Sequence, residues 1–190
     1  HEYDMQDKIS GILPLTKYNL LASNVHISPN SAWHNTVKPA TVEVCNGNKY
    51  GIIGTSPIDL YKRSKEGTLK KEVQVDKIRE TIQDIQKEAD KLQEQGINKI
   101  ILLSHLGYTL DKIVANQTQG IDVILGGHSH DLLLDVKEGE NLFYSKTGEP
   151  VVITQAGRDG KNFGILNLEF SPDGIIKKVQ NNVGYTKDFN

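Results

Sequence analysis

Three histidines directly follow strand-like apolar segments and could act as metal ligands. His105 comes after one such segment, and His128 and His130 come after the next one and a Gly-Gly pair. Imidazole is the commonest neutral metal ligand, and glycines let the backbone approach an ion without a Cβ in the way. A single strand-end histidine is more often a polar cap than a ligand, but this combination favours a metal site.

A strand, a helix and a second strand must position these histidines. Residues 99–104 and 121–125 are continuous apolar runs, and residues 106–116 between them have helical spacing. This pattern predicts a βαβ unit whose parallel strands are buried on both faces. Because ligands of open α/β sheets bind just outside the carboxyl ends of parallel strands, we expect both histidine clusters to project into the same crevice.

A long amphipathic helix is predicted before this unit. Apolar residues recur at intervals of three and four from Val75 to Leu92, with Asp76 able to cap the start and Gly96 able to end the helix. The spacing also suits a short coiled coil, but strand-like segments on both sides favour a crossover helix packed on a sheet.

The other segments are typical of short β-strands. They are residues 20–25, 41–44 and 50–54 before the helix, and 132–136, 142–145, 151–154, 164–170 and 175–182 after the βαβ unit. Asn46-Gly47 is a strong hairpin-turn signal. No repeat, low-complexity tract or linker divides the chain, so we predict a single α/β domain over residues 1–190.

Composition excludes several functional classes. The chain has 22 Lys and Arg against 24 Asp and Glu, without a basic run, which argues against a nucleic acid polymer as partner. Its apolar runs are too short for a transmembrane segment. Cys45 is the one cysteine, so no internal disulfide can form. His26 and His34 lie among polar residues, where we expect solvated loop side chains.

Several motifs together resemble the 5′-nucleotidase branch of the calcineurin-like metallophosphoesterases, which includes UDP-sugar hydrolases and cyclic-nucleotide phosphodiesterases. His1-Glu2-Tyr3-Asp4 resembles the end of that family's Gly-Asn-His-Glu-aromatic-Asp motif, and residues 104–107 and 126–130 resemble its two later metal motifs. Supporting matches lie at residues 22–25, 51–57, 155–158 and 163–164. The resemblance covers nearly the whole chain, and Gly126–His130 is its most specific part.

The resemblance implies a four-layer αββα sandwich that hydrolyses nucleotide phosphate esters with two divalent ions of the Zn, Mn, Mg or Ca class. It implies that His105 and His128 bind one ion and that His130 binds the other. His1 would lie over the phosphate and help the leaving oxygen depart, while Asp4 holds its imidazole in the useful tautomer. Such proteins are often periplasmic or on the cell surface.

The family pattern begins upstream of His1. Asp-x-His and Gly-Asp motifs are absent from residues 1–190, and these residues do not include the C-terminal nucleotide-recognition domain that the resemblance leads us to expect. We therefore expect a truncated sandwich without its N-terminal strands, weak or no catalysis by the isolated chain, and at most one bound ion. An exposed sheet edge or apolar surface should favour self-association or pairing with the missing N-terminal portion.

Other functions fit the same residues. A 2′,3′-cyclic-nucleotide phosphodiesterase or a UDP-sugar hydrolase shares the metal motifs, and a non-catalytic module could hold a single structural or sensory ion. A mature chain that begins with His1 could also chelate copper, as oxidative polysaccharide-cleaving enzymes do, but those resemble β-sandwiches, whereas this sequence predicts an α/β fold.

Overall fold

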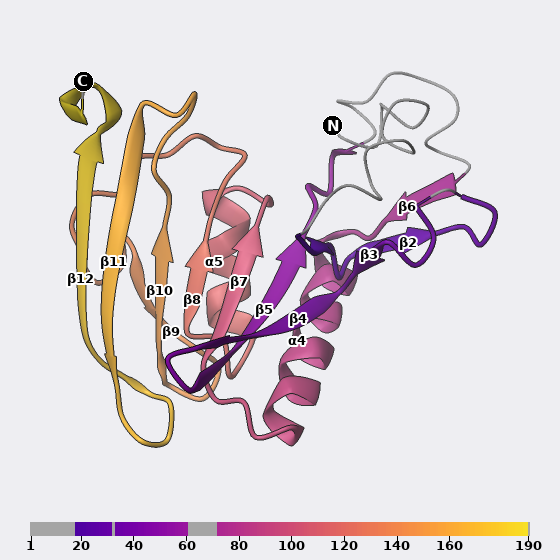
Figure 1. Cartoon of the computed structure of the whole chain (residues 1–190), viewed down its shortest axis with the longest axis horizontal. Coiled ribbons are helices and arrows are strands. Elements are labelled where there is room, and N and C mark those ends of the chain that lie inside the picture. The colour runs from indigo at the N-terminus through magenta and orange to yellow at the C-terminus, as the bar shows by residue number, and fades with distance from the viewer. Residues whose placement is uncertain (1–17, 32, 61–71, 190) are drawn as a thin grey trace.

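Six strands form the central sheet, in the order β4-β5-β7-β8-β10-β9 (Figure 1). The structure is a computed structural model that describes residues 18–31, 33–60 and 72–189. The strands are β4 (Ala40–Cys45), β5 (Asn48–Thr55), β7 (Ile100–Ser104), β8 (Val123–Leu125), β9 (Leu142–Tyr144) and β10 (Pro150–Thr154). The four inner strands run parallel, and the edge strands β4 and β9 are antiparallel to their neighbours.

Two helices pack on one face of this sheet. They are α4 (Ile78–Glu94) and α5 (Tyr108–Gln117). Ile85 and Ala89 of α4 and Val114 of α5 form one buried cluster with Ile100 and Leu102 of β7. The helices bury the apolar side chains of alternate strand residues, as expected for a crossover layer.

A β-hairpin covers part of the opposite face. It consists of β11 (Asn162–Phe170) and β12 (Ile176–Tyr185), and Ile176 packs with Val123 and Val152 of the central sheet. The hairpin leaves Leu103 and Leu125, near the carboxyl ends of β7 and β8, exposed at 42% and 38%. The prediction that both strands are buried on both faces is therefore wrong at these ends.

The remaining elements lie outside the central sheet. They are β1 (Leu20–Leu21), β2 (Val25–Ile27), β3 (Val37–Lys38), β6 (Val73–Val75) and the 3-10 helix η3 (Thr186–Phe189). β1 pairs with β3 in parallel, and β2 pairs with β6 in antiparallel fashion. The predicted strand at 20–25 is split because the Asn24 side chain bonds both the N–H and the C=O of Ser56, at 2.9 Å each, and turns the chain.

The long helix begins later than its apolar pattern predicts. Val75 belongs to β6 and pairs with Val25, so α4 begins at Ile78 with Lys77 as its N-cap. Asp76 is not the N-cap residue, and the N-cap position at Lys77 has no side-chain capping hydrogen bond. Gly96 ends the helix with φ +76°, as predicted.

Two further strand predictions have opposite outcomes. The Asn46-Gly47 hairpin turn is confirmed: both residues have positive φ and connect β4 with β5. The predicted strand at 132–136 is wrong, because only Leu132 forms an isolated bridge there, with Ala156. The side-chain amide of Asn181 bonds the carbonyls of Leu133 and Leu134, which replaces a strand ladder in this segment.

Candidate functional site

The carboxyl ends of β7 and β8 bring two of the predicted ligands together. The strands are parallel neighbours, with Leu103 opposite Leu125, so the segments that follow them leave the sheet at the same edge. The His105 and His128 rings lie edge to face, with their centroids 5.3 Å apart and their planes at 72°. His130 is exposed, whereas His1 and Asp4 lie outside the described residues.

Glycines make room for this histidine pair. A Cβ at Gly127 would lie 3.3 Å from Nδ1 of His105, and a Cβ at Gly107 would lie 3.4 Å from Cδ2 of His128. His128 and His130 themselves have φ of +74° and +63°, in the left-handed region that few non-glycine residues adopt. Such backbone strain costs on the order of 1–3 kcal/mol per residue and clusters at functional sites.

The buried side chain of Gln155 holds the loop that carries His128. Its amide nitrogen donates to the Gly127 carbonyl at 3.2 Å, and its amide oxygen accepts from the Asp131 N–H at 2.6 Å. Gln155 directly follows β10, so a third parallel strand also contributes to this edge. The sequence motif at 155–158 marked this position, but its role depends on a contact that only the fold creates.

Ser129 also holds the loop that follows β8, through contacts with α5 and Asp131. Its hydroxyl oxygen accepts from the Tyr108 N–H at 3.0 Å, and the hydroxyl lies 2.5 Å from the Asp131 carboxylate, to which it donates. The first residue of α5 and the loop after β8 are thereby joined directly. This contact sets the position of the neighbouring histidines from two elements of the βαβ unit.

Asp111 of α5 is a buried acid beneath the same loop. Its Oδ1 accepts a 2.5 Å hydrogen bond from the hydroxyl of Ser104, the last residue of β7. A Cβ at Gly126 would lie only 2.7 Å from Oδ2 of Asp111. Burial raises the pKa of Asp111 from 3.8 to about 7, against the lowering effect of the Ser104 hydrogen bond. In the sequence this residue was one polar position within a helical pattern.

Asp59 is a second acid that the sequence pattern did not indicate. Its Oδ1 lies 3.5 Å from Nε2 of His128, and its side chain is 29% exposed. It lies just after β5, the neighbour of β7 in the sheet. A carboxylate next to a ligating histidine orients the ring and raises its basicity. Asp59 is therefore placed to orient His128.

A separate group of potential ligands includes His26. One ligand atom each from His26, Asp76 and Asp84 lies within 4.8 Å of the others. His26 is exposed, as expected, but it belongs to β2 and not to a loop, and its Nε2 lies 2.5 Å from Oδ2 of Asp76. His34 is exposed, as expected.

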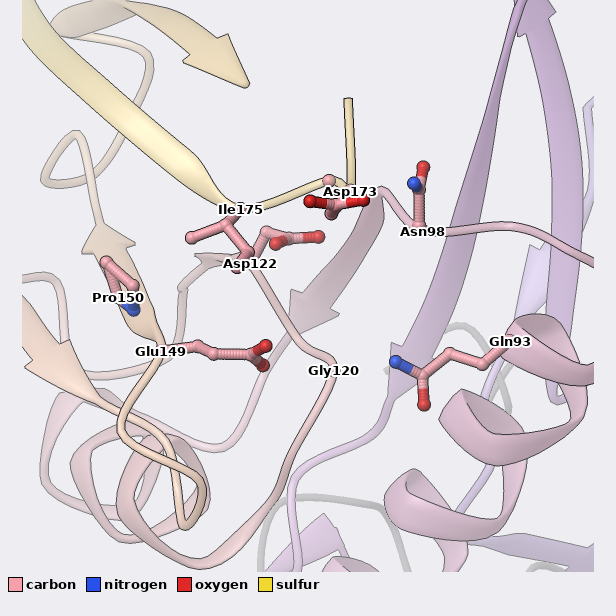
Figure 2. Close-up of a pocket in the computed structure, with 9 residues that line it drawn as sticks. Gln93, Asn98, Gly120, Asp122, Glu149, Pro150, Asp173 and Ile175 are labelled. Atoms are coloured by element: carbon pink, nitrogen blue, oxygen red, sulfur yellow. The ribbon is translucent and has the colours of Figure 1, made fainter. Parts of the chain in front are cut away.

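A small cavity lies at the opposite end of the strands (Figure 2). It is lined by Gln93, Asn98, Gly120, Asp122, Glu149, Pro150, Asp173, Gly174 and Ile175. Asp122 accepts a 2.7 Å hydrogen bond from the N–H of Ile100, the first residue of β7. Burial raises the pKa of Asp122 to about 7. Because the cavity lies at the amino ends of the strands, it is not part of the histidine site.

The fold and this edge define a metallophosphoesterase-type α/β domain. The chain superposes on a 5′-nucleotidase precursor from Thermus thermophilus with a TM-score of 0.86 and 28% identity, covering 97% of this chain and 37% of that one. No protein-family model matches the chain. Among the described helices, none is long and apolar enough to cross a membrane.

Relatives found by sequence are also named 5′-nucleotidases. The chain is 32% identical over 188 residues to a probable 5′-nucleotidase of Treponema pallidum, covering 93% of this chain and 31% of that protein. It is 34% identical to the NAD 5′-nucleotidase of Haemophilus influenzae, covering 92% of this chain and 30% of that protein. The chain belongs to the 5′-nucleotidase branch of the metallophosphoesterases, and it spans well under half the length of these relatives.

Proposed function

We propose that the whole protein hydrolyses phosphate esters of nucleotides at the carboxyl edge of β7 and β8. The observation that carries this proposal is the edge-to-face pair of His105 and His128 within a cradle of glycines. Parallel α/β sheets bind their ligands at this edge. The relatives named 5′-nucleotidase support a nucleotide as the substrate, and the Thermus protein's description as a precursor supports a periplasmic or cell-surface location.

The residues at this edge fit a divalent cation. Two imidazoles come from neighbouring strand ends, and no Cβ of Gly107 or Gly127 occupies the space beside them. In this proposal His105 and His128 hold one ion and His130 holds a second. Divalent ions in phosphoesterases neutralise charge on the phosphoryl oxygens and lower the pKa of bound water.

The chain's own side chains have three further tasks in this proposal. Asp59 orients the His128 ring, and Gln155 holds the loop so that the histidines keep their positions when substrate arrives. His1 donates a proton to the leaving oxygen, and Asp4 keeps its imidazole in the required tautomer. His1 and Asp4 enter by resemblance, since they lie outside the described residues.

Replacing His128 in the whole protein tests the assignment. His128→Asn is the suitable change, because asparagine tolerates the left-handed backbone that residue 128 adopts, with φ +74°. We expect phosphate release from adenosine 5′-monophosphate to fall by at least about a hundredfold, the upper end of what loss of a partner around a metal ligand costs. The circular dichroism spectrum should not change.

The matched control is His34→Asn, at an exposed histidine outside this site. Its turnover should equal that of the unmodified protein. Equal turnover in the His128→Asn protein would refute the site assignment, and failure of the unmodified protein to release phosphate from any nucleotide would refute the proposed reaction.

A further inference from the structure

His26, Asp76 and Asp84 meet at a point that the proposed hydrolytic site does not use. His26 belongs to β2, Asp76 lies between β6 and α4, and Asp84 belongs to α4. Nε2 of His26 lies 2.5 Å from Oδ2 of Asp76, and one ligand atom from each residue lies within 4.8 Å of the others. None of the three residues belongs to β7, β8 or the loops that follow them.

Backbone contacts hold these three positions together. The Asp76 N–H donates to the Asn24 carbonyl at 3.0 Å, next to the pairing of Val25 with Val75. Thr81, which is completely buried, donates from its hydroxyl to the Asp76 carbonyl and accepts from the Asn24 side chain, both at 3.4 Å. Ligands that come from paired strands and a packed helix are held more exactly than ligands on free loops.

The charges at this point favour a cation. Two carboxylates lie close together, and burial, followed by the hydrogen bond and the charge of Asp76, raises the pKa of Asp84 to about 6. His26 and Lys87 have the opposite effect on Asp84. Within the described residues, no lysine or arginine forms an ion pair with either aspartate. The imidazole of His26 contacts Asp76 directly, and Asp84 lies in the same group of ligand atoms.

We propose that His26, Asp76 and Asp84 form a binding site for a divalent transition-metal ion of the Zn²⁺ class. One imidazole and two carboxylates are a ligand set that such ions accept, whereas Mg²⁺ and Ca²⁺ prefer oxygen ligands throughout. A tetrahedral zinc ion needs its ligand atoms roughly 3.3 Å apart, given metal–ligand distances of about 2.0–2.1 Å. The His26 side chain is 58% exposed, so its ring can turn away from Asp76 to reach that separation.

The ion would connect β2 to the first half of α4 and leave a position for water. A site with three protein ligands and one open position also remains accessible to chelators. Its binding should therefore be reversible and should raise the midpoint of thermal unfolding as zinc is added, because an ion that binds only the folded chain stabilises it.

A zinc titration of the chain stripped of metal tests this proposal. The titration uses isothermal calorimetry on a chain with His105→Asn, His128→Asn and His130→Asn, so that the predicted ligands at the ends of β7 and β8 do not contribute heat. We expect one saturable zinc site, and we expect His26→Gln or Asp84→Asn to weaken it by at least about tenfold. His34→Gln, at an exposed histidine, is the matched control and should bind as its parent does.

Two results would overturn the proposal. One is a titration without a saturable site, and the other is equal zinc affinity in the His26→Gln, Asp84→Asn and His34→Gln chains. Anomalous diffraction at the zinc edge from crystals of the unmodified chain gives a second, independent readout. A peak bonded to Nε2 of His26 supports the site, and occupied zinc peaks elsewhere with none at His26 contradict it.

Discussion

The buried acid Asp111 makes a sharp prediction about pH and stability. Its side chain is completely buried, with Oδ1 bonded to the Ser104 hydroxyl and Oδ2 facing Gly126. Oδ2 has no hydrogen-bond partner among the described residues. Asp111→Asn keeps the shape of the side chain and removes its ionisation. The pH dependence of the change in stability therefore isolates the cost of a charge at this position.

The sign and size follow from the raised pKa. Burial raises the pKa of Asp111 from 3.8 to about 7, so over this interval the folded chain keeps a proton that the unfolded chain has lost. The unfolding free energy of the unmodified chain therefore falls as pH rises from about 4 to about 7. Between pH 5 and pH 8 this linkage lowers the unfolding free energy of the unmodified chain by at most about 2.5 kcal/mol. The asparagine variant does not show this decrease.

Urea unfolding at pH 5, 6, 7 and 8 measures this effect. The unfolding free energy of Asp111→Asn minus that of the unmodified chain should increase steadily over this range. The buried amide of Asp111→Asn also lowers the unfolding free energy of the variant by about 1–3 kcal/mol, by the same amount at every pH. Asp135→Asn, at an exposed aspartate, is the matched control and should show a flat difference. A flat difference for Asp111→Asn as well would refute the argument from burial.

Two further predictions concern the loop and the sheet. Gln155→Ala removes the hydrogen bond to the Gly127 carbonyl, and we expect calorimetry to show a roughly 10–100-fold weaker affinity of the histidine site for Mn²⁺ or Zn²⁺; unchanged affinity would contradict the positioning role. Gly54→Ala would place a Cβ 2.4 Å from the Leu21 carbonyl oxygen, so we expect urea unfolding to show a loss of at least about 1–3 kcal/mol. Gly164→Ala meets nothing closer than 3.7 Å and should lose much less.

Local patterns in the sequence predicted much of the fold. The three- and four-residue spacing of apolar residues predicted α4, and the two apolar runs predicted β7 and β8 as parallel neighbours. The Asn46-Gly47 pair predicted the turn between β4 and β5. These features are local: periodicity and turn chemistry act over a few residues, so the sequence displays them directly.

Long-range pairing decided what those patterns missed. α4 begins at Ile78 because Val75 pairs with Val25, which lies far earlier in the chain. Residues 132–136 form no regular strand, since the Asn181 side chain bonds the Leu133 and Leu134 carbonyls. In both places local propensity was compatible with the prediction, and a distant partner changed the outcome.

The candidate site divides in the same way. The sequence by itself determined that His105, His128 and His130 follow two parallel strands, because each motif is contiguous with its strand. Only the tertiary structure showed that Asp59 lies beside His128, that Asp111 and Gln155 bond the strand end and the loop next to the histidines, and that His26 lies near Asp84. The physical reason is that these contacts join elements far apart in the chain. No local pattern encodes such contacts, and they form only when the sheet sets the positions of its neighbours.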